Sequence, residues 1–293
     1  MMPNPAYCEL QKDINHRMRD VLLDWMVEVH QSFKMIPETL YLAINILDRY
    51  LSLIQVPSNT LQLAGITALF IAAKVEEIAI PEIKEFAYMA DNAYSLEEIR
   101  RAERHVLQKI NFRLSYPNPM NFLRRISKAD DYDTLSRTVG KYLLEIAIVD
   151  HRFMGFAPSL IAAGAMYLAR HILNKGIWVR RVAYLTKRRP PLNLTPFVDT
   201  SQITVFCCSI APAPPPPFPP FPPTHRVLPS QDATLAHYAG YDEEDILPVV
   251  SLMVVYISEP IHESLYKKYA GKKFSKVSVR VHEWYQSRKN GRQ

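Results

Sequence analysis

The distribution of proline constrains the fold of this chain more than any other feature of its sequence. Thirteen of the 23 prolines lie between Pro190 and Pro229, most densely in residues 211–223, whereas the whole chain has only eight glycines. Because proline interrupts an α-helix and favours polyproline II, this stretch is predicted to be irregular and disordered. No segment elsewhere alternates convincingly between apolar and polar residues, so we predict an all-α protein.

Apolar residues recur at helical spacing on both sides of the proline-rich stretch. Ser95 and Glu98 have the spacing of a capping box, and residues 61–73 are apolar nearly all round, which is typical of a central helix surrounded by others. In the first half we predict helices at 18–34, 37–53, 58–77, 81–90 and 95–111. In the second half we predict helices at 120–127, 132–149, 158–174, 232–239, 242–257 and 261–269, with a basic helix around 277–288.

The two halves share an alanine-rich pattern. LQLAGITALFIAAKV in the first half resembles PSLIAAGAMYLARHI in the second. The small residues in both segments would let neighbouring helices approach closely; they are Ala64, Gly65, Ala72, Ala73, Ala162, Ala163, Gly164 and Ala165. A weak internal repeat of about 100 residues follows, which predicts two related helical units.

Motifs for chemistry are missing from the sequence. It has no glycine-rich phosphate loop, no nucleophile elbow, no zinc-binding HExxH and no CxxC pair, and its three cysteines (Cys8, Cys207 and Cys208) lack metal-ligand spacing. We therefore predict no enzymatic activity, no bound metal and no cofactor. No apolar run reaches the roughly 18 residues that would span a membrane, so no membrane association is expected.

The net charge of +6 and the pI of about 9.1 hint at nucleic acid. Residues 179–231 contain six Lys or Arg and one acid, which leaves +1 for the rest of the chain. That balance gives no reason to expect nucleic-acid binding.

Four polar residues interrupt apolar helices. Arg19 and Asp48, each flanked by core positions, are interpreted as a structural ion pair that locks the first two helices. Lys74 ends a long apolar run and Glu103 lies in the middle of its helix. Each is either simply solvated, or the two form a polar pair that hydrogen-bonds the backbone of a partner, and the sequence alone does not choose.

The helix predicted at 18–34 carries two apolar stripes, although one is enough to bury a helix face. By periodicity alone the surplus stripe belongs to the core. The alternative is an exposed apolar patch that binds a partner.

Four segments together resemble the cyclin box: MRDVLLDWMVEVH (18–30), LAINILDRYLS, LQLAGITALFIAAKVEEI and AERHVLQKINFRLSYPNPMNFLRR. The five residues most associated with that box fall at Arg19, Asp48, Leu63, Lys74 and Glu103. In the second half, SLIAAGAMYLARHI and KKYAGKKF look specifically like fungal B-type mitotic cyclins.

The resemblance implies two tandem five-helix cyclin-box folds. The first occupies residues 18–116, after a remnant of an N-terminal helix region at 1–17, and the second occupies 117–178 plus 232–288. It also implies an activating subunit of a cyclin-dependent kinase at G2/M, present in nucleus and cytoplasm, that does no chemistry itself.

Two surfaces are implied by the same resemblance. The kinase-binding residues are expected to be Lys74, Val75, Glu103, Leu107 and Phe112. A patch that docks Arg-x-Leu motifs of substrates or inhibitors is expected to contain Met18, Val21, Leu22, Trp25, Glu28, Leu61 and Gln62. The second hypothesis is a cyclin-fold adaptor in transcription that binds nucleic acid or a transcriptional kinase, which would need a basic face across both repeats.

The sequence departs from the family in two places. B-type cyclins carry a preceding helix and a long N-terminal region that are mostly absent here, so no degradation signal is assigned and weaker kinase binding is expected. Removal of residues 179–231 restores the continuous family pattern around Trp178 and Asp232. We interpret this block as a translated intron, with a genuine surface insertion as the alternative, and transcript sequencing distinguishes the two.

Overall fold

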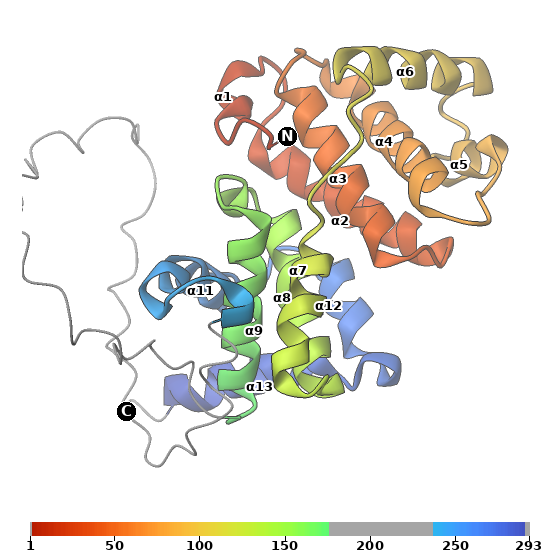
Figure 1. Cartoon of the computed structure of the whole chain (residues 1–293). Coiled ribbons are helices and arrows are strands. Elements are labelled where there is room, and N and C mark those ends of the chain that lie inside the picture. The colour runs from red at the N-terminus through yellow and green to blue at the C-terminus, as the bar shows by residue number, and fades with distance from the viewer. Residues whose placement is uncertain (1, 176–236, 291–293) are drawn as a thin grey trace, which may run out of the picture.

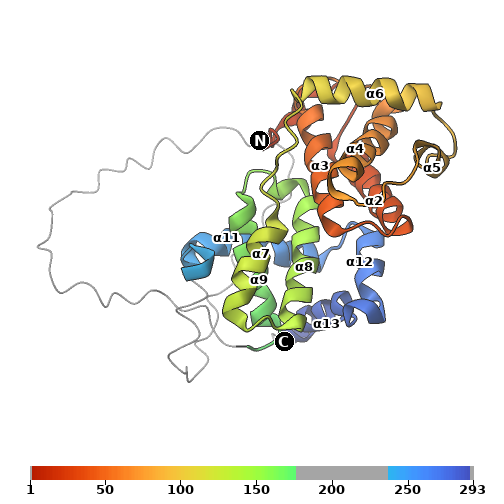
Figure 2. The same cartoon turned by 45° about the vertical axis from the view of Figure 1, so that its right-hand side comes forward.

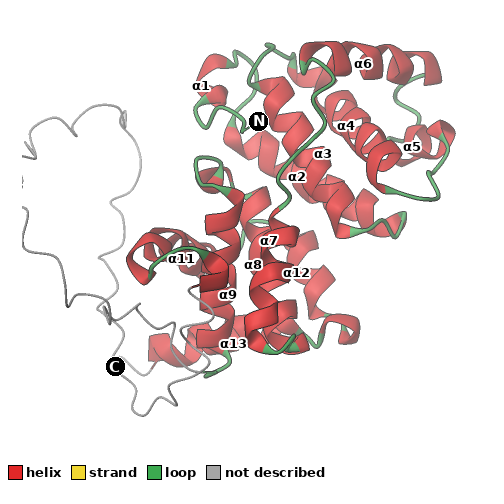
Figure 3. Cartoon of the chain, in the orientation of Figure 1, coloured by secondary structure: helices red, strands yellow, loops and turns green. Residues whose placement is uncertain are grey.

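The computed structural model describes residues 2–175 and 237–290, and the described chain contains helices and no strand (Figures 1 and 3). The first-half helices are α1 (Tyr7–Leu10), α2 (His16–Ser32), α3 (Pro37–Leu51), η1 (Ser58–Thr60), α4 (Leu61–Glu76), α5 (Ile83–Met89) and α6 (Leu96–Lys109). The second-half helices are α7 (Pro119–Ser127), η2 (Lys128–Asp130), α8 (Thr134–Val149), η3 (His151–Phe153), α9 (Pro158–Ile172), α11 (Glu243–Ser258), α12 (Glu263–Ala270), η4 (Lys272–Phe274) and α13 (Val277–Asn290).

The first domain is built around α4. This helix is buried along nearly its whole length and packs against α2, α3, α5 and α6, as its all-round apolar sequence predicts. Gly65 lies where α4 meets α2, and a Cβ built there would stand 2.9 Å from Leu22 Cδ1. The absence of a side chain at this position therefore sets how closely the two helices approach.

The second domain repeats the plan around α9, which packs against α7, α8 and α11 (Figure 2). A Cβ at Gly164 would lie 2.9 Å from Val249 Cγ1 of α11. The prediction of an all-α protein with two related helical domains is confirmed for the described residues. The predicted insertion at 179–231, and most of the helix predicted at 232–239, lie outside the described residues.

Some helix boundaries differ from those predicted. The helix predicted from residue 132 begins at Thr134, because Asp131 and Tyr132 adopt left-handed φ angles of 47° and 55°. The Asp133 carboxylate then accepts a hydrogen bond from the backbone N–H of Ser136 and caps the first turn. The capping box of Ser95 with Glu98 is present at the start of α6 as predicted.

Residues 2–17 are packed onto the first domain. Tyr7 of α1 is fully buried, and Gln11 Nε2 donates to the carbonyl oxygens of Leu51 and Ile54, at 2.7 Å each. One of these bonds satisfies the carbonyl of Leu51, the last residue of α3, which the helix itself leaves without a donor, and the other satisfies a carbonyl in the loop that follows.

Two further searches covered the described residues. No single helix there has the length and apolar composition needed to cross a membrane, although α11 and α12 meet that test as a pair bent by 90°. In the same part of the chain, no group of three or more His, Cys, Asp or Glu side chains could hold a metal ion.

The two glycine contacts predict unequal costs of adding a methyl group. Gly164→Ala should lower the free energy of unfolding by about 1–2 kcal/mol, because Val249 is short and stiff and overpacking forces backbone movement. Gly65→Ala should cost less, since the tip of Leu22 can rotate away. Urea denaturation measures both, with Gly155→Ala as the control because its nearest contact would be an ordinary 3.8 Å. Equal costs at Gly65 and Gly164 would contradict this argument.

Candidate functional site

A polar pair lies between the C-terminal end of α4 and the middle of α6. Lys74 Nζ is 2.6 Å from Glu103 Oε1, and the Lys74 ammonium lies 4.1 Å from the centre of the Phe70 ring. The side chains of Lys74 and Glu103 are 41% and 15% exposed. The pair is therefore ordered by two contacts while its polar atoms remain within reach of a partner.

Apolar side chains follow the two members of this pair along α4 and α6. Val75 is 48% exposed, Phe112 is 64% exposed and Leu107 is half-buried. Asn111 and Phe112 both have left-handed φ angles, of 54° and 52°, and the Phe112 N–H donates to the Leu107 carbonyl. A bulky residue rarely adopts this conformation, which here ends α6 and leaves the Phe112 ring in solvent. We call Lys74, Val75, Glu103, Leu107 and Phe112 the α4–α6 surface.

The expected docking patch is only partly exposed. Val21 is 67% exposed, Glu28 is exposed, and Met18, Trp25 and Gln62 are half-buried. The expectation of exposure is wrong for Leu22 and Leu61, which are only 6% and 5% exposed. For Leu22 the reason lies at Gly65, which brings α4 close enough to α2 to cover this side chain. We keep the name docking patch for the five members that solvent reaches.

The second domain contacts the docking patch through α12, at residues that the sequence did not point to. The Ser264 N–H donates to Asp24 Oδ1 at 3.0 Å, and the Ser264 hydroxyl is within hydrogen-bond distance of Asp24 Oδ2 and of Glu28 Oε1, at 3.1 and 2.7 Å. A carboxylate at the N-terminal turn of α12 satisfies a backbone donor and complements the helix dipole. The only local signal was the i, i+4 spacing of Asp24 and Glu28.

Arg19 and Asp48 form a buried ion pair. Arg19 Nε and Nη2 donate to the two Asp48 oxygens at 2.8 and 2.7 Å, and Nη1 donates to the Val149 carbonyl of the second domain at 2.5 Å. Tyr7 donates its hydroxyl to the same carboxylate at 2.9 Å. Burial opposes the charge of Arg19, but the Asp48 carboxylate keeps the Arg19 pKa above its ordinary value.

Histidines from both domains meet beside this pair. His16 and His151 are stacked with ring centres 3.8 Å apart, and His262 Nε2 lies 3.8 Å from Asp20 Oδ1. Burial lowers the pKa of all three imidazoles, to about 4 for His151 and His262, and raises the pKa of Asp20 to about 6. We call the contact between α2 and these second-domain residues the domain seam.

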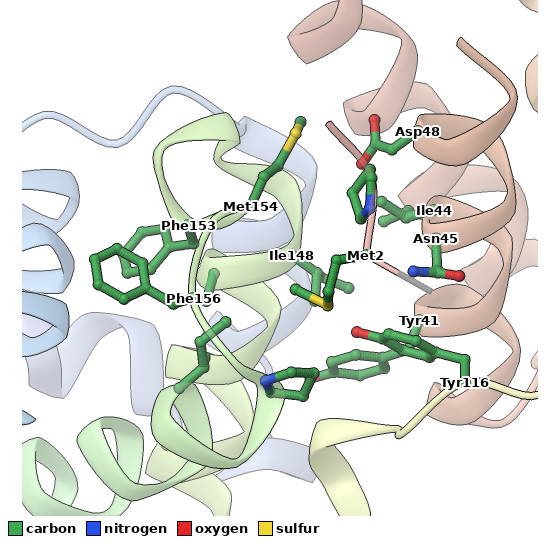
Figure 4. Close-up of a pocket in the computed structure, with 14 residues that line it drawn as sticks. Met2, Tyr41, Ile44, Asn45, Asp48, Tyr116, Ile148, Phe153, Met154 and Phe156 are labelled. Carbon is green, nitrogen blue, oxygen red and sulfur yellow. The ribbon is translucent and has the colours of Figure 1, made fainter. Parts of the chain in front are cut away.

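A small pocket, open to solvent, lies between the domains and is lined on the first-domain side by Asp48 and other residues of α3 (Figure 4). The buried hydroxyl of Tyr41 on its wall has no hydrogen-bond partner among the described residues. Of the predicted site residues, only Asp48 lines the pocket, and its oxygens already accept from Arg19 and Tyr7. The pocket is therefore distinct from the α4–α6 surface and from the docking patch.

Family comparisons divide the chain in the same way as the structure. The cyclin N-terminal domain family matches residues 1–115, and the cyclin C-terminal domain family matches 117–193 and 225–283. The stretch that the C-terminal domain family leaves unmatched, between residues 193 and 225, lies within the predicted insertion at 179–231. The family does match residues 179–193 and 225–231, which we assigned to the insertion.

Curated relatives are fungal mitotic cyclins. A G2/mitotic-specific cyclin-B of Emericella nidulans is 44% identical over 97% of this chain, and the G2/mitotic-specific cyclin cdc13 of Schizosaccharomyces pombe is 43% identical over 97%. The chain spans 48% of the length of each. The X-ray structure of a viral cyclin from Herpesvirus saimiri shares the fold, with a TM-score of 0.53 and 22% identity over 58% of this chain and 76% of that one.

The buried ion pair predicts a large loss of stability when one partner is removed. Arg19→Met should lower the free energy of unfolding by about 3–5 kcal/mol, because the Asp48 carboxylate stays buried without its counter-ion. The same substitution at the exposed Arg104, which pairs with Glu97, should cost under about 1 kcal/mol and is the matched control. Urea denaturation measures both, and similar costs for the two variants would refute the central role of Arg19.

The domain seam predicts a loss of stability in mild acid. Folding lowers the pKa values of His16, His151 and His262, so the folded state resists protonation of these imidazoles more than the unfolded state does. Their contribution to the free energy of unfolding is therefore complete above about pH 6.5 and is lost as the pH falls towards about 4. Asp20, whose folded pKa is raised to about 6, changes stability in the opposite sense and offsets one of them. The melting temperature should therefore fall as the pH is lowered from 6.5 to 4.5.

The matched variants are His151→Gln, which should flatten this pH dependence, and His105→Gln on the exposed face of α6, which should leave it unchanged. An identical pH profile for His151→Gln and the unmodified chain would count against the seam as the origin of the effect.

Proposed function

This chain belongs to the cyclin family, and on that premise we propose that it is the activating regulatory subunit of a cyclin-dependent kinase that controls G2/M progression. The proposal includes a heterodimer with the kinase, a location in nucleus and cytoplasm, and no catalysis by this chain. The alternative, an adaptor in transcription that binds nucleic acid or a transcriptional kinase, is less favoured because the named relatives are mitotic cyclins.

The observation that carries the proposal is the α4–α6 surface. The Lys74–Glu103 pair, at 2.6 Å, presents a donor and an acceptor between the exposed side chains of Val75 and Phe112. Such a surface suits a partner helix that buries apolar side chains and offers backbone groups at one end. Binding there would keep the kinase's regulatory helix inward, so that the kinase's own Lys–Glu pair forms and its activation loop is ordered.

We also propose that the docking patch binds Arg-x-Leu segments of substrates or inhibitors. Exposed Val21 and half-buried Trp25 offer apolar area, and Glu28 adds a carboxylate beside them. An apolar surface next to an acid is complementary to a short peptide that combines a cationic and an apolar residue.

Removal of the polar pair tests the kinase site. Lys74→Ala and Glu103→Ala should each weaken kinase binding by about tenfold or more, because each leaves its former partner without a counter-charge in the interface. Titration calorimetry with a purified cyclin-dependent kinase, and histone kinase activity of the mixture, measure the effect. Lys84→Ala, which removes an exposed lysine paired with Glu82, is the control. If Lys74→Ala bound the kinase as well as Lys84→Ala does, the proposed site would be wrong.

Trp25→Ala tests the docking patch separately. This change should weaken binding of an Arg-x-Leu peptide by about tenfold while kinase binding stays nearly intact, since Trp25 lies on α2 and outside the α4–α6 surface. Fluorescence anisotropy with the peptide and calorimetry with the kinase give the two readouts. A loss of kinase binding would instead assign Trp25 to the core.

A further inference from the structure

The first turn of α12 lies against the docking patch, although α12 belongs to the second domain. Ser264 makes hydrogen bonds to both Asp24 and Glu28, and Glu28 is itself a member of the patch. Figures 1 and 2 both show α12 below α2. The surface of the patch therefore continues onto the second domain without a break at the domain seam.

Large apolar side chains are exposed on both sides of this contact. Asp20 of α2 lies close to His262 of the second domain. Exposed Val21 follows Asp20 in the chain, and Ile261, which is 55% exposed, precedes His262. Apolar side chains that gather beside an ordered polar contact are typical of a binding surface, whereas scattered ones need no explanation.

The charge around this contact is negative. Asp24 and Glu28 both contact Ser264, and Glu263 directly precedes Ser264, so three acids lie at this contact. Burial raises the pKa of Asp24, and the carboxylates of Glu28 and Glu263 raise it further. Lys267 forms an ion pair with Glu263 at 2.8 Å, with both side chains more than 70% exposed. An exposed pair of this kind is weak, so a cation of a ligand can replace Lys267 beside Glu263.

We propose that the docking surface extends across the domain seam, and that Ile261 and Glu263 bind the part of a docked peptide that lies beyond its Arg-x-Leu motif. The fitting segment carries a lysine or arginine that faces Glu263 and an apolar residue that packs on Ile261. This inference rests on the docking function proposed above. It adds a second-domain subsite that selects among peptides with the same core motif.

The experiment compares a core peptide, which contains only the Arg-x-Leu motif, with two peptides that extend it by a Lys- and Leu-containing segment at the N-terminal or C-terminal side. Fluorescence anisotropy measures their affinities for the whole chain and for Ile261→Ser, Glu263→Gln, Trp25→Ala and Glu283→Gln. Glu283 is an exposed acid on α13 and serves as the charge control.

At least one extended peptide should bind about fivefold more tightly than the core peptide. Ile261→Ser and Glu263→Gln should each remove part of that gain without changing the affinity of the core peptide, and Glu283→Gln should change neither. The part of the gain that depends on Glu263 should also shrink in high salt.

Two results would overturn the inference, and they are distinguishable. If Trp25→Ala abolishes binding of the core peptide but no extended peptide gains affinity through Ile261 or Glu263, the second-domain subsite is wrong and the docking patch stands. If Trp25→Ala leaves the core peptide bound as tightly as before, the docking patch itself is wrong and the subsite fails with it.

Discussion

The arrangement of the two domains depends on one buried charge, the guanidinium of Arg19. It donates to both oxygens of Asp48 on α3 and to the backbone carbonyls of Val149 and Ile148 at the end of α8. A buried cation without partners would cost several kcal/mol, so these bonds have to form together. They fix α2 against its neighbour in the first domain and against the second domain at the same time, and Tyr7 attaches α1 to the same carboxylate.

Helix geometry explains how α2 serves several contacts at once. At about 100° per residue, Asp20, Asp24 and Glu28 form one row along the helix, and this row faces the start of α12. Val21 and Trp25 form the next row, which reaches solvent. The row beyond that packs against α4. Among the apolar residues of this helix, Val21 therefore reaches solvent whereas Leu22 is buried against α4, and the acidic row makes the contact with α12.

Local patterns in the sequence predicted the helices, the capping box at Ser95 and the pairing of Arg19 with Asp48, because each depends on spacing or on polar residues within apolar runs. For Lys74 and Glu103 the same patterns left pairing and simple solvation both open, and the structure shows the pair. Periodicity alone also placed Leu22 in the core, whereas the family resemblance placed it on an exposed patch; its burial depends on how closely Gly65 lets a distant helix approach. Local patterns did not indicate Ser264, whose partners lie 236 and 240 residues away in the chain. Periodicity identifies a face of a helix but not the segment that covers it.

The α4–α6 surface and the docking patch share one support. Lys74 lies near the C-terminal end of α4, whereas Leu61, at the other end of this 16-residue helix, packs beneath the patch. Because α4 rises about 1.5 Å per residue, Leu61 and Lys74, 13 residues apart, are separated by about 20 Å. The helix is buried along its length in a close-packed core, so this separation is rigid. On the proposed function, a substrate bound at the patch is thereby kept at a fixed distance from the kinase bound at the other end, and its effective concentration at the kinase active site rises without any change in the kinase itself.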